Sequence, residues 1–392
     1  MERPLNIVFF PTSVNFGLAG TNRLQNIIYF LKKENTDSIS NIALEDKSKL
    51  FEKGNEELFL KNYKEIYYAP SIGKFIKHIF TTSWYILKSR KKKSKNLIYF
   101  YGEVDIKNFF FVIWARLLGF RIVIDVVEDL DAVHKFRSFK NKIKYKSAVF
   151  FRKRLNRFAD GFVVVSTHLS TKFSDKFPDS PQFFLPVTIN KDLLNGESKP
   201  SPDQTLVVFY SGSFNEKDGL PYLIQGLKKV KDQGKKFKLV LSGKGTDKEM
   251  INFWNEVENC GLKSEVDYRG FLNRSSYVNI LANEVNVLCM TRINSAFANA
   301  GFPFKLGEFL ATGKPVIASK IGDVEKYLSK NDAFLVEPEN EEQIKAALID
   351  IIENPDAARQ VGINGKKVAM AYFDHQQYST GLKNFITNKI WL

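Results

Sequence analysis

The stretch GFPFKLGEFLATGKPVIASK, residues 301–320, decides the fold of the second half of the chain. Pro303 suits a first helical turn, because its fixed φ matches the helix and its missing N–H costs nothing there. Gly313 supplies a left-handed residue just past the helix end, and Pro315 cannot continue the helix. An apolar strand follows at once. The stretch therefore predicts a short helix that leads directly into a buried strand.

Two charged side chains lie near the start of this predicted helix. Lys305 and the free N–H groups of the first turn form a site for an anion such as phosphate. Glu308 is close enough to accept hydrogen bonds from sugar hydroxyls beside that anion. Phosphate on the helix end and ribose on the carboxylate is the geometry of a nucleotide site. The alternative is a surface ion pair between the two side chains, worth only a few tenths of a kcal/mol.

The composition is that of a globular protein with more than one domain. The chain has 392 residues, too many for one ordinary core and about right for two. Hydrophobic residues make up 44% and charged residues 26%, which excludes a disordered chain. Cys260 and Cys289 have no histidine spacing around them, so we expect a reducing compartment and neither a disulfide framework nor a structural zinc. We expect no signal peptide, and charges interrupt the apolar stretch 109–127, which predicts a helix and a buried strand.

Short apolar runs alternate with longer helical patterns along the whole sequence. Such runs, separated by helices, are typical of parallel sheets that are covered on both faces. We therefore predict an α/β fold class, with two doubly wound, Rossmann-like domains facing a cleft. The predicted parts are a first domain at 1–190, a polar linker at 191–204, a second domain at 205–370, and a C-terminal helix at 371–392 that crosses back to the first domain.

Glycine turns follow several predicted strands. In the second domain, YSGSFNEKDG (210–219) carries Gly212, Ser213 and Lys217, and Gly243 ends the strand at 236–243. In the first domain, Gly17 and Gly20 open a helix after the first strand and could cradle a phosphate. Their G-x-x-G spacing is not the dinucleotide pattern G-x-G-x-x-G, which argues against a nicotinamide enzyme.

Taken in order, five segments of the second half resemble the retaining glycosyltransferases of family 4, which have the two-domain GT-B fold. The segments are FPFKLGEFLATGKPVIAS, YSGSFNEKDGLPYLIQGL, LVLSGKG, VDYRGFLNRSSY and FLVEPENEEQIKAALIDIIENP. The resemblance implies that a nucleotide-sugar donor binds mainly to the second domain, with Glu308 on the ribose and Lys217 at the diphosphate. The family's first paired glutamate is replaced by Ala300, and the Arg after its loop glycine by Ser213. Arg292 stands where some relatives carry an upstream Arg.

We infer from this resemblance that Lys305, Arg292 and Lys217 together supply the positive charge that the diphosphate needs. No metal and no cofactor would then be required, and the nucleotide-sugar is a substrate. Glu128, Asp129 and His134 follow a strand of the first domain and could orient the hydroxyl of an acceptor, although His134 could equally be an ordinary loop histidine. Asp129 and Asp131 also match the D-x-D motif of the other major glycosyltransferase fold, which is metal-dependent and which we rank second.

The positive charge is concentrated in the first half of the chain. The net charge is +15, and residues 61–160 carry 23 Lys and Arg against 8 Asp and Glu. Within this region we predict a membrane-facing patch of four basic residues, interleaved with aromatic ones: Lys142, Lys144, Arg152 and Arg154. Such a patch attracts anionic lipid headgroups, although it could also be a solvated helix face. No nucleic-acid-binding motif accompanies it.

The sequence thus predicts a hexosyltransferase-like, metal-independent glycosyltransferase that adds a sugar to a glycan or a lipid-linked acceptor in the synthesis of cell-surface polysaccharides or glycoconjugates. We expect it in the cytoplasm, held peripherally at the inner face of the membrane, with no nucleic-acid partner. The competing hypothesis is a catalytically silent relative that binds nucleotide or membrane without turnover.

Overall fold

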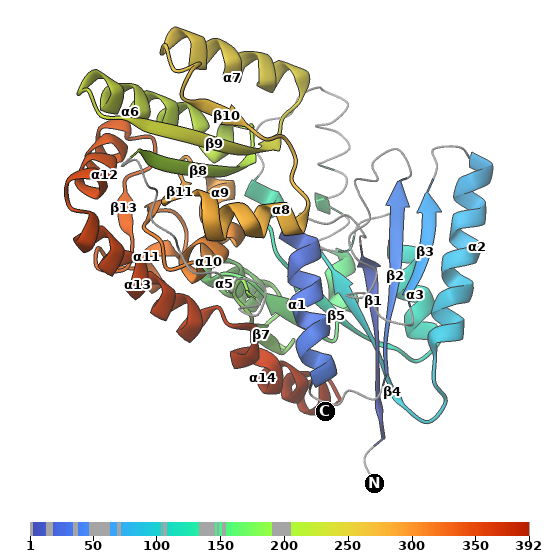
Figure 1. The fold of residues 1–392 in the computed structure, drawn as a ribbon. Helices are drawn as coiled ribbons and strands as arrows, with labels where there is room; N and C mark the ends of the chain where they lie inside the picture. The colour runs from blue at the N-terminus through green and yellow to red at the C-terminus, as the bar shows by residue number, and fades with distance from the viewer. Residues whose placement is uncertain are drawn as a thin grey trace. The chain divides into compact units, whose positions relative to one another are not determined.

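A computed structural model describes residues 3–12, 19–33, 38–46, 63–68, 72–102, 104, 108–132, 146, 149–150, 154–189 and 205–391 (Figure 1). The chain divides into two compact units, each built on one parallel sheet. Unit 1 comprises residues 1–186 and 375–392, and unit 2 comprises residues 187–374. The predicted linker at 191–204 lies outside the described residues.

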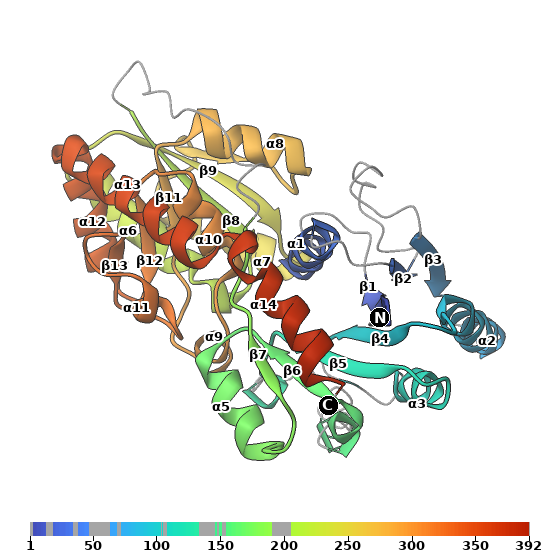
Figure 2. The same ribbon diagram turned by 90° about the horizontal axis from the view of Figure 1, so that it is seen from below.

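Unit 1 contains a sheet of seven parallel strands in the order β3-β2-β1-β4-β5-β6-β7. Its strands are β1 (Leu5–Thr12), β2 (Ser38–Asp46), β3 (Tyr63–Tyr68), β4 (Lys95–Tyr101), β5 (Arg121–Val126), β6 (Gly161–Val164) and β7 (Gln182–Phe184). Its principal helices are α1 (Ala19–Lys33), α2 (Ile72–Ser89), α3 (Phe109–Leu117), α5 (Thr167–Lys176) and α14 (Ser379–Asn384). In Figure 2, α1 and α14 lie on one side of the sheet, and α2, α3 and α5 lie on the other.

The C-terminal segment completes the core of unit 1. Leu382, Phe385, Ile386 and Ile390 are buried in one apolar cluster with Leu24 and other residues of α1 and with residues of β1 and β4. Phe183 of β7 packs on Phe385, with ring centroids 5.6 Å apart. Residues nearly 200 positions beyond the first sheet therefore contribute to its hydrophobic core.

Unit 2 contains a sheet of six parallel strands in the order β10-β9-β8-β11-β12-β13. Its strands are β8 (Leu206–Ser213), β9 (Phe237–Lys244), β10 (Val266–Tyr268), β11 (Val287–Met290), β12 (Val316–Ser319) and β13 (Phe334–Val336). Its helices are α6 (Leu220–Asp232), α7 (Asp247–Asn259), α8 (Arg274–Asn279), α9 (Ala296–Ala300), α10 (Phe304–Ala311), α11 (Val324–Tyr327), α12 (Glu341–Glu353) and α13 (Pro355–Tyr372).

The two faces of β8 show why this sheet is covered on both sides. Val208 and Tyr210 face a buried cluster that α6, α7 and α12 complete. Phe209 lies between them in sequence and contacts the rings of Phe309 on α10 and Tyr277 on α8. Because successive side chains of a strand point to opposite faces, both faces of the strand are apolar.

The stretch at 301–320 folds as its sequence predicts. Pro303 is the N-cap residue, one position before the first helical turn in which it was expected, and Gly313 has φ +76°, in the left-handed region that suits glycine. β12 begins three residues later at Val316. The predicted fold class, with a Rossmann-like parallel sheet in each half of the chain, is confirmed.

A fully buried ion pair anchors α1 to the first sheet. Arg23 donates from Nε and Nη2 to the two carboxylate oxygens of Asp125, at 2.9 Å each, and both side chains are 0% exposed. Arg23 also donates to the carbonyl oxygens of Leu185 (3.0 Å) and Pro186 (2.8 Å). The guanidinium therefore joins a helix, a strand end and the segment that leaves β7.

We expect the Arg23→Met substitution to lower the free energy of unfolding of unit 1 by roughly 3–5 kcal/mol, because it leaves Asp125 buried without its partner. The double variant Arg23→Met/Asp125→Leu removes both charges and should recover much of that loss. Hydrogen exchange of unit 1 peptides measures the effect. The matched control is Arg121→Met, because Arg121 is 42% exposed, shares Asp160 with Arg116 and should cost less than about 1 kcal/mol. Equal losses in the two single variants would contradict the expectation.

Candidate functional site

The second sheet reverses its strand order between β8 and β11. The chain runs outward from β8 through β9 to β10 and then returns to β11 on the other side of β8. Ligands of open parallel sheets bind beyond the carboxyl ends of the strands at such a reversal. The residues at this place are the end of β8 (211–213), Arg292 after β11, and the first turn of α10.

Glycines allow the loops at this edge to approach one another. Gly219 has φ +66°, and a Cβ atom there would lie 1.7 Å from the carbonyl oxygen of Thr291. Gly243 has φ +137°, and a Cβ atom there would lie 1.7 Å from the carbonyl oxygen of Gly212. The Ile293 N–H donates to the Lys217 carbonyl at 3.1 Å, so the loops after β8 and β11 are joined through their backbones.

Lys305 extends from α10 to the end of β8. Its Nζ donates to the Ser211 hydroxyl at 2.7 Å and lies 5.9 Å from the centroid of the Tyr277 ring. Burial lowers the pKa of Lys305 to about 8, although the negative charges of Glu308 and Asp218 oppose this effect. The lysine is therefore a partly desolvated ammonium that lacks full compensation and would gain from a bound anion.

Arg292 is held by an acidic residue that the sequence interpretation overlooked. Its Nε lies 3.2 Å from Oδ1 of Asp218, and the Ser213 hydroxyl donates to Oδ2 of the same carboxylate. Asp218 thus occupies the centre of the glycine loop, between Ser213 and Arg292. Lys217 stands beside it in sequence, and its Nζ lies 4.7 Å from the centroid of the Phe297 ring. In the sequence, the one signal for Asp218 is that it stands next to Lys217 in a glycine turn.

The partners of Glu308 come from α8. Arg274 Nη1 donates to Glu308 Oε1 at 2.7 Å, and the Tyr277 hydroxyl donates to Oε2 at 3.2 Å. Burial alone would lower the pKa of Arg274, but the Glu308 carboxylate outweighs it and raises that pKa. Burial and the same carboxylate raise the pKa of Tyr277 well above its usual value, so the phenol remains a donor. Glu308 is therefore paired with Arg274, not with Lys305 as the surface ion-pair alternative required. Arg274 and Tyr277 were not predicted as site residues, and their i,i+3 spacing on one helix face was the available signal for a shared partner.

The acidic residues predicted to meet an acceptor lie at the end of β5 in unit 1. Asp129 accepts hydrogen bonds from His168 Nε2 (2.8 Å) and from Lys172, whereas Glu128 is exposed. Burial would raise the pKa of Asp129, but Lys172 and His168 outweigh it and lower that pKa. Asp131 pairs with Lys172 at 2.9 Å.

The D-x-D alternative is wrong on its fold, because it required the other glycosyltransferase architecture, whereas each half of this chain carries its own Rossmann-like sheet. Its two carboxylates are also occupied by cationic side chains. Within the described part of the chain, no group of three or more His, Cys, Asp or Glu residues is arranged to hold a metal ion.

Several predicted residues lie outside the described residues: Gly17, His134, Lys142, Lys144 and Arg152. Arg154 is described and exposed, and its guanidinium lies 4.0 Å from the centroid of the Phe150 ring. No helix in the described residues is both long enough and apolar enough to span a membrane.

Known proteins resemble this chain in fold, and a family model matches its second half. Residues 195–368 match the family model of the glycosyl transferases group 1. An uncharacterized glycosyltransferase of Methanocaldococcus jannaschii is 24% identical over 234 residues, and the chain spans about 60% of that relative's length.

Two solved structures illustrate the likeness in fold. HepE of Anabaena, in complex with UDP and glucose, is 16% identical, with a TM-score of 0.74 over 98% of this chain and 100% of that chain. Sucrose-phosphate synthase of Thermosynechococcus elongatus is 14% identical, with a TM-score of 0.71 over 98% of each chain. The chain therefore has the GT-B fold, and its second half matches the group 1 glycosyl transferases.

The lowered pKa of Lys305 makes the stability of the protein depend on pH. Between pH 8 and pH 10.5 the unfolded chain keeps this proton while the folded chain loses it, so the wild-type protein should gain stability relative to a Lys305→Met variant as pH rises. The variant should be the more stable at pH 7, by at most roughly 3 kcal/mol, and its advantage should shrink above pH 8. Urea unfolding of both proteins across this range measures the difference. A constant difference would contradict the lowered pKa.

Proposed function

We propose that this chain is a retaining glycosyltransferase of the family 4 type that takes its sugar from a nucleotide-sugar donor. The observation that carries the proposal is the gathering of Lys305, Arg292 and Glu308 at the strand-order reversal of unit 2. The family match at residues 195–368 supports the same reaction class. Structures of HepE with UDP, and with UDP-glucose, make UDP-sugars the first donors to test.

In this proposal the diphosphate binds at the first turn of α10, next to Lys305. Arg292 and Lys217 contribute further positive charge from the loops after β11 and β8. Glu308 accepts hydrogen bonds from the ribose hydroxyls. When the donor binds, Arg274 either leaves the Glu308 carboxylate or donates to it together with the ribose. Tyr277 holds the remaining carboxylate oxygen in place.

The proposed reaction breaks the bond between the anomeric carbon and the diphosphate oxygen. The electron pair leaves with the nucleoside diphosphate, and an acceptor hydroxyl forms the new bond to the anomeric carbon on the same face. The leaving phosphate takes the proton of that hydroxyl, so no dedicated protein base is assigned. Preorganised cations stabilise the developing negative charge, and donors of this kind are worth roughly 3–4 kcal/mol each in comparable sites. No metal or cofactor is required by this scheme.

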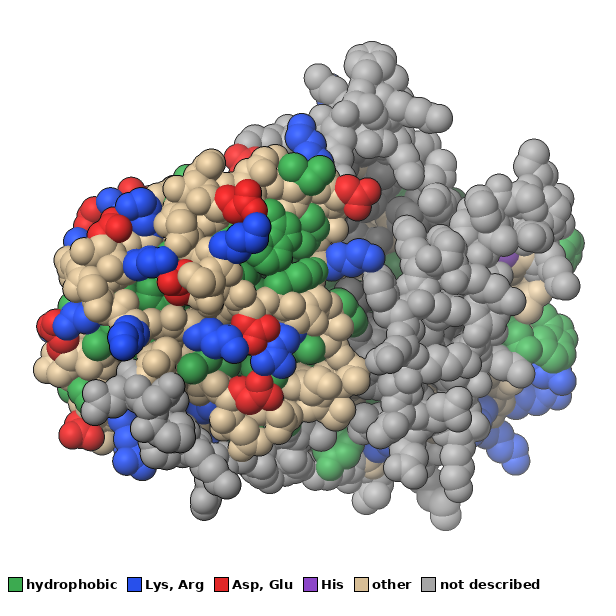
Figure 3. Space-filling view, turned by 45° about the horizontal axis from the view of Figure 1, so that its top comes forward, with side chains coloured by type: hydrophobic (Ala, Val, Ile, Leu, Met, Phe, Trp, Pro, Cys, Tyr) green, Lys and Arg blue, Asp and Glu red, His purple; other side chains and the backbone are tan. Residues whose placement is uncertain are grey.

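We further propose that the acceptor is a glycan or a lipid-linked glycan, in cell-surface polysaccharide or glycoconjugate synthesis at the inner face of the membrane. The support is the charge distribution: the net charge of +15 over the chain equals the excess within residues 61–160. On unit 2, in contrast, Figure 3 shows acidic and basic side chains interspersed over the visible surface. Glu128 and Asp129 remain our candidates for orienting the acceptor.

A nucleoside diphosphate that fits the site should stabilise the protein. At about 100 times its dissociation constant, we expect a gain of roughly 2.7 kcal/mol, which raises the melting temperature by several degrees. A panel of nucleoside diphosphates in a thermal-shift assay identifies the base. The affinity should fall as the pH rises through about 8, because Lys305 then loses its charge. If no nucleoside diphosphate of the panel raises the melting temperature, the proposed nucleotide site is contradicted.

Transfer should depend on the two charged residues of α10. We expect Lys305→Ala or Glu308→Ala to reduce release of nucleoside diphosphate, with donor and acceptor present, by roughly 100-fold. The control is Lys345→Ala on α12, where the half-buried lysine pairs only with Glu342 in the described contacts. Binding of donor without release by the wild-type protein would favour the catalytically silent relative, for which Ala300 and Ser213 are the sequence arguments.

A further inference from the structure

Two neighbouring helices of unit 1 carry large hydrophobic side chains on their outer surface. On α2, Phe80, Trp84 and Leu87 are 72%, 49% and 46% exposed, and their spacing of four and three residues puts them on one face. On α3, Phe110 and Leu117 are 48% and 76% exposed and stand two helical turns apart. We call these five residues the α2–α3 apolar face.

The two helices present this face together. The Trp114 indole N–H of α3 donates to the Ser83 carbonyl of α2 at 3.0 Å, so the helices are joined side by side. Five of the eleven large hydrophobic side chains that are exposed in the described chain belong to this face. A concentration of this kind marks an interaction surface, whereas single exposed hydrophobic residues need no explanation.

A basic segment borders the apolar face. Residues 88–95, KSRKKKSK, contain six Lys and Arg and no acidic residue. Lys88 Nζ lies 4.7 Å from the centroid of the Trp84 ring, and Arg90 Nε donates to the Leu118 carbonyl at 2.6 Å, next to Leu117. Among the described residues, no carboxylate forms an ion pair with any of the six. Figure 3 shows hydrophobic and basic side chains side by side at its right-hand edge, where α2 lies.

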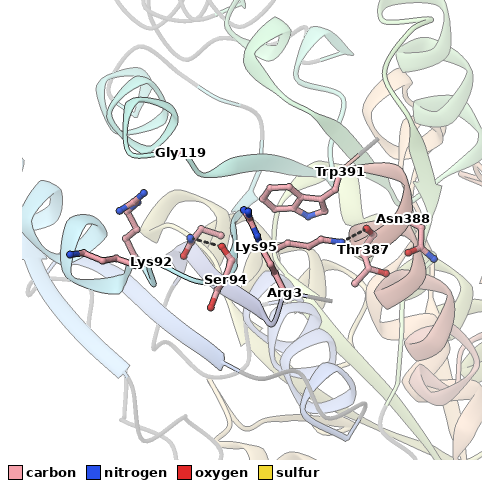
Figure 4. Close-up of a pocket in the computed structure, with 10 residues that line it drawn as sticks. Arg3, Lys92, Ser94, Lys95, Gly119, Thr387, Asn388 and Trp391 are labelled. Carbon is pink, nitrogen blue, oxygen red and sulfur yellow. Dashed lines mark hydrogen bonds between the residues drawn. The ribbon is translucent and has the colours of Figure 1, made fainter. Parts of the chain in front are cut away.

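The basic segment leads into a pocket of about 630 Å³ at the edge of the sheet where β1, β4 and β5 begin (Figure 4). Its lining includes Arg3, Arg90, Lys92 and Lys95 and no carboxylate. Trp391 lines the side opposite Lys92, and its indole Nε1 is buried without a hydrogen-bond partner in the described chain. The pocket therefore offers positive charge with no carboxylate among its lining residues, which suits an anion.

We propose that the α2–α3 apolar face and the basic segment 88–95 dock this protein on an anionic bilayer, with lipid phosphates on the basic segment and in the adjoining pocket. Apolar side chains beside a lysine and arginine rim enter the acyl boundary while the charged groups stay among the headgroups. A Trp at the border between the two is at its preferred depth. The surface is distinct from the patch at 142–154. The inference rests on the membrane part of the proposed function but not on the transfer reaction.

The test is flotation of the full chain with vesicles of phosphatidylcholine alone and with added phosphatidylglycerol. We expect binding to the anionic vesicles only, weakened by salt. Arg90→Gln/Lys92→Gln/Lys93→Gln should weaken binding by roughly 100-fold. The variant Trp84→Ser/Leu117→Ser should also release the protein from the vesicles when the salt concentration is held constant. Matched controls in unit 2 are Lys263→Gln/Lys330→Gln/Lys345→Gln, which also removes three charges, and Ile251→Ser/Ile363→Ser for exposed hydrophobic residues.

The outcomes separate this inference from its alternatives. Unchanged binding in both α2–α3 variants, with release only when Lys142, Lys144, Arg152 and Arg154 are neutralised, overturns it. Concentration-dependent dimerisation that the Trp84→Ser/Leu117→Ser variant abolishes also overturns it, because the face would then cover a second copy of the chain. With a soluble acceptor, release of nucleoside diphosphate from the donor should stay at the wild-type rate in every variant. If the wild-type protein binds vesicles but releases no nucleoside diphosphate, the proposed transfer reaction is contradicted and the docking inference is not.

Discussion

The structure of unit 2 depends on one constraint, the contact between the backbones of the loops that follow β8 and β11. These strands are neighbours in the sheet, and although the chain leaves them toward opposite sides, their loops touch at Gly219 and Thr291. Only a residue without a Cβ atom fits against the Thr291 carbonyl with φ +66°. Because these backbones touch, Asp218 and Arg292 are brought within hydrogen-bonding distance, and the end of β8 lies open to Lys305.

The site that results is preorganised at a cost in electrostatic free energy. Lys305 is half-buried with a hydroxyl as its hydrogen-bond partner, and Arg292 and Glu308 are each neutralised by a neighbour of opposite charge. An anion would compensate the lysine directly, and it would compete with Asp218 for Arg292. The site therefore trades stability without ligand for affinity with it, as expected where charge must be stabilised in a reaction.

Much of the fold could be predicted from the sequence, and less of the site. The turn residues of 301–320 determine local conformation directly, so α10, Gly313 and β12 lie where expected. The strands β2 and β3 are hard to predict from sequence, because SISNIALED and YKEIYY carry charged and polar residues and lack a continuous apolar run. Among the site residues, Lys305 and Glu308 were found because motif spacing names them. Asp218, Arg274, Tyr277 and the His168–Lys172 pair were missed, because their roles arise from contacts with residues 31 to 74 positions away, which no local pattern encodes.

The return of residues 375–392 to unit 1 has a consequence for biosynthesis. Leu382, Phe385, Ile386 and Ile390 belong to the core of the first sheet, yet the ribosome makes them after the whole of unit 2. Until these residues are made, α1 and the first sheet are incompletely covered, whereas unit 2 already has every strand and helix that it needs. The chain should therefore fold out of its sequence order during translation, with the second unit compact first and the first unit sealed by the last segment to emerge.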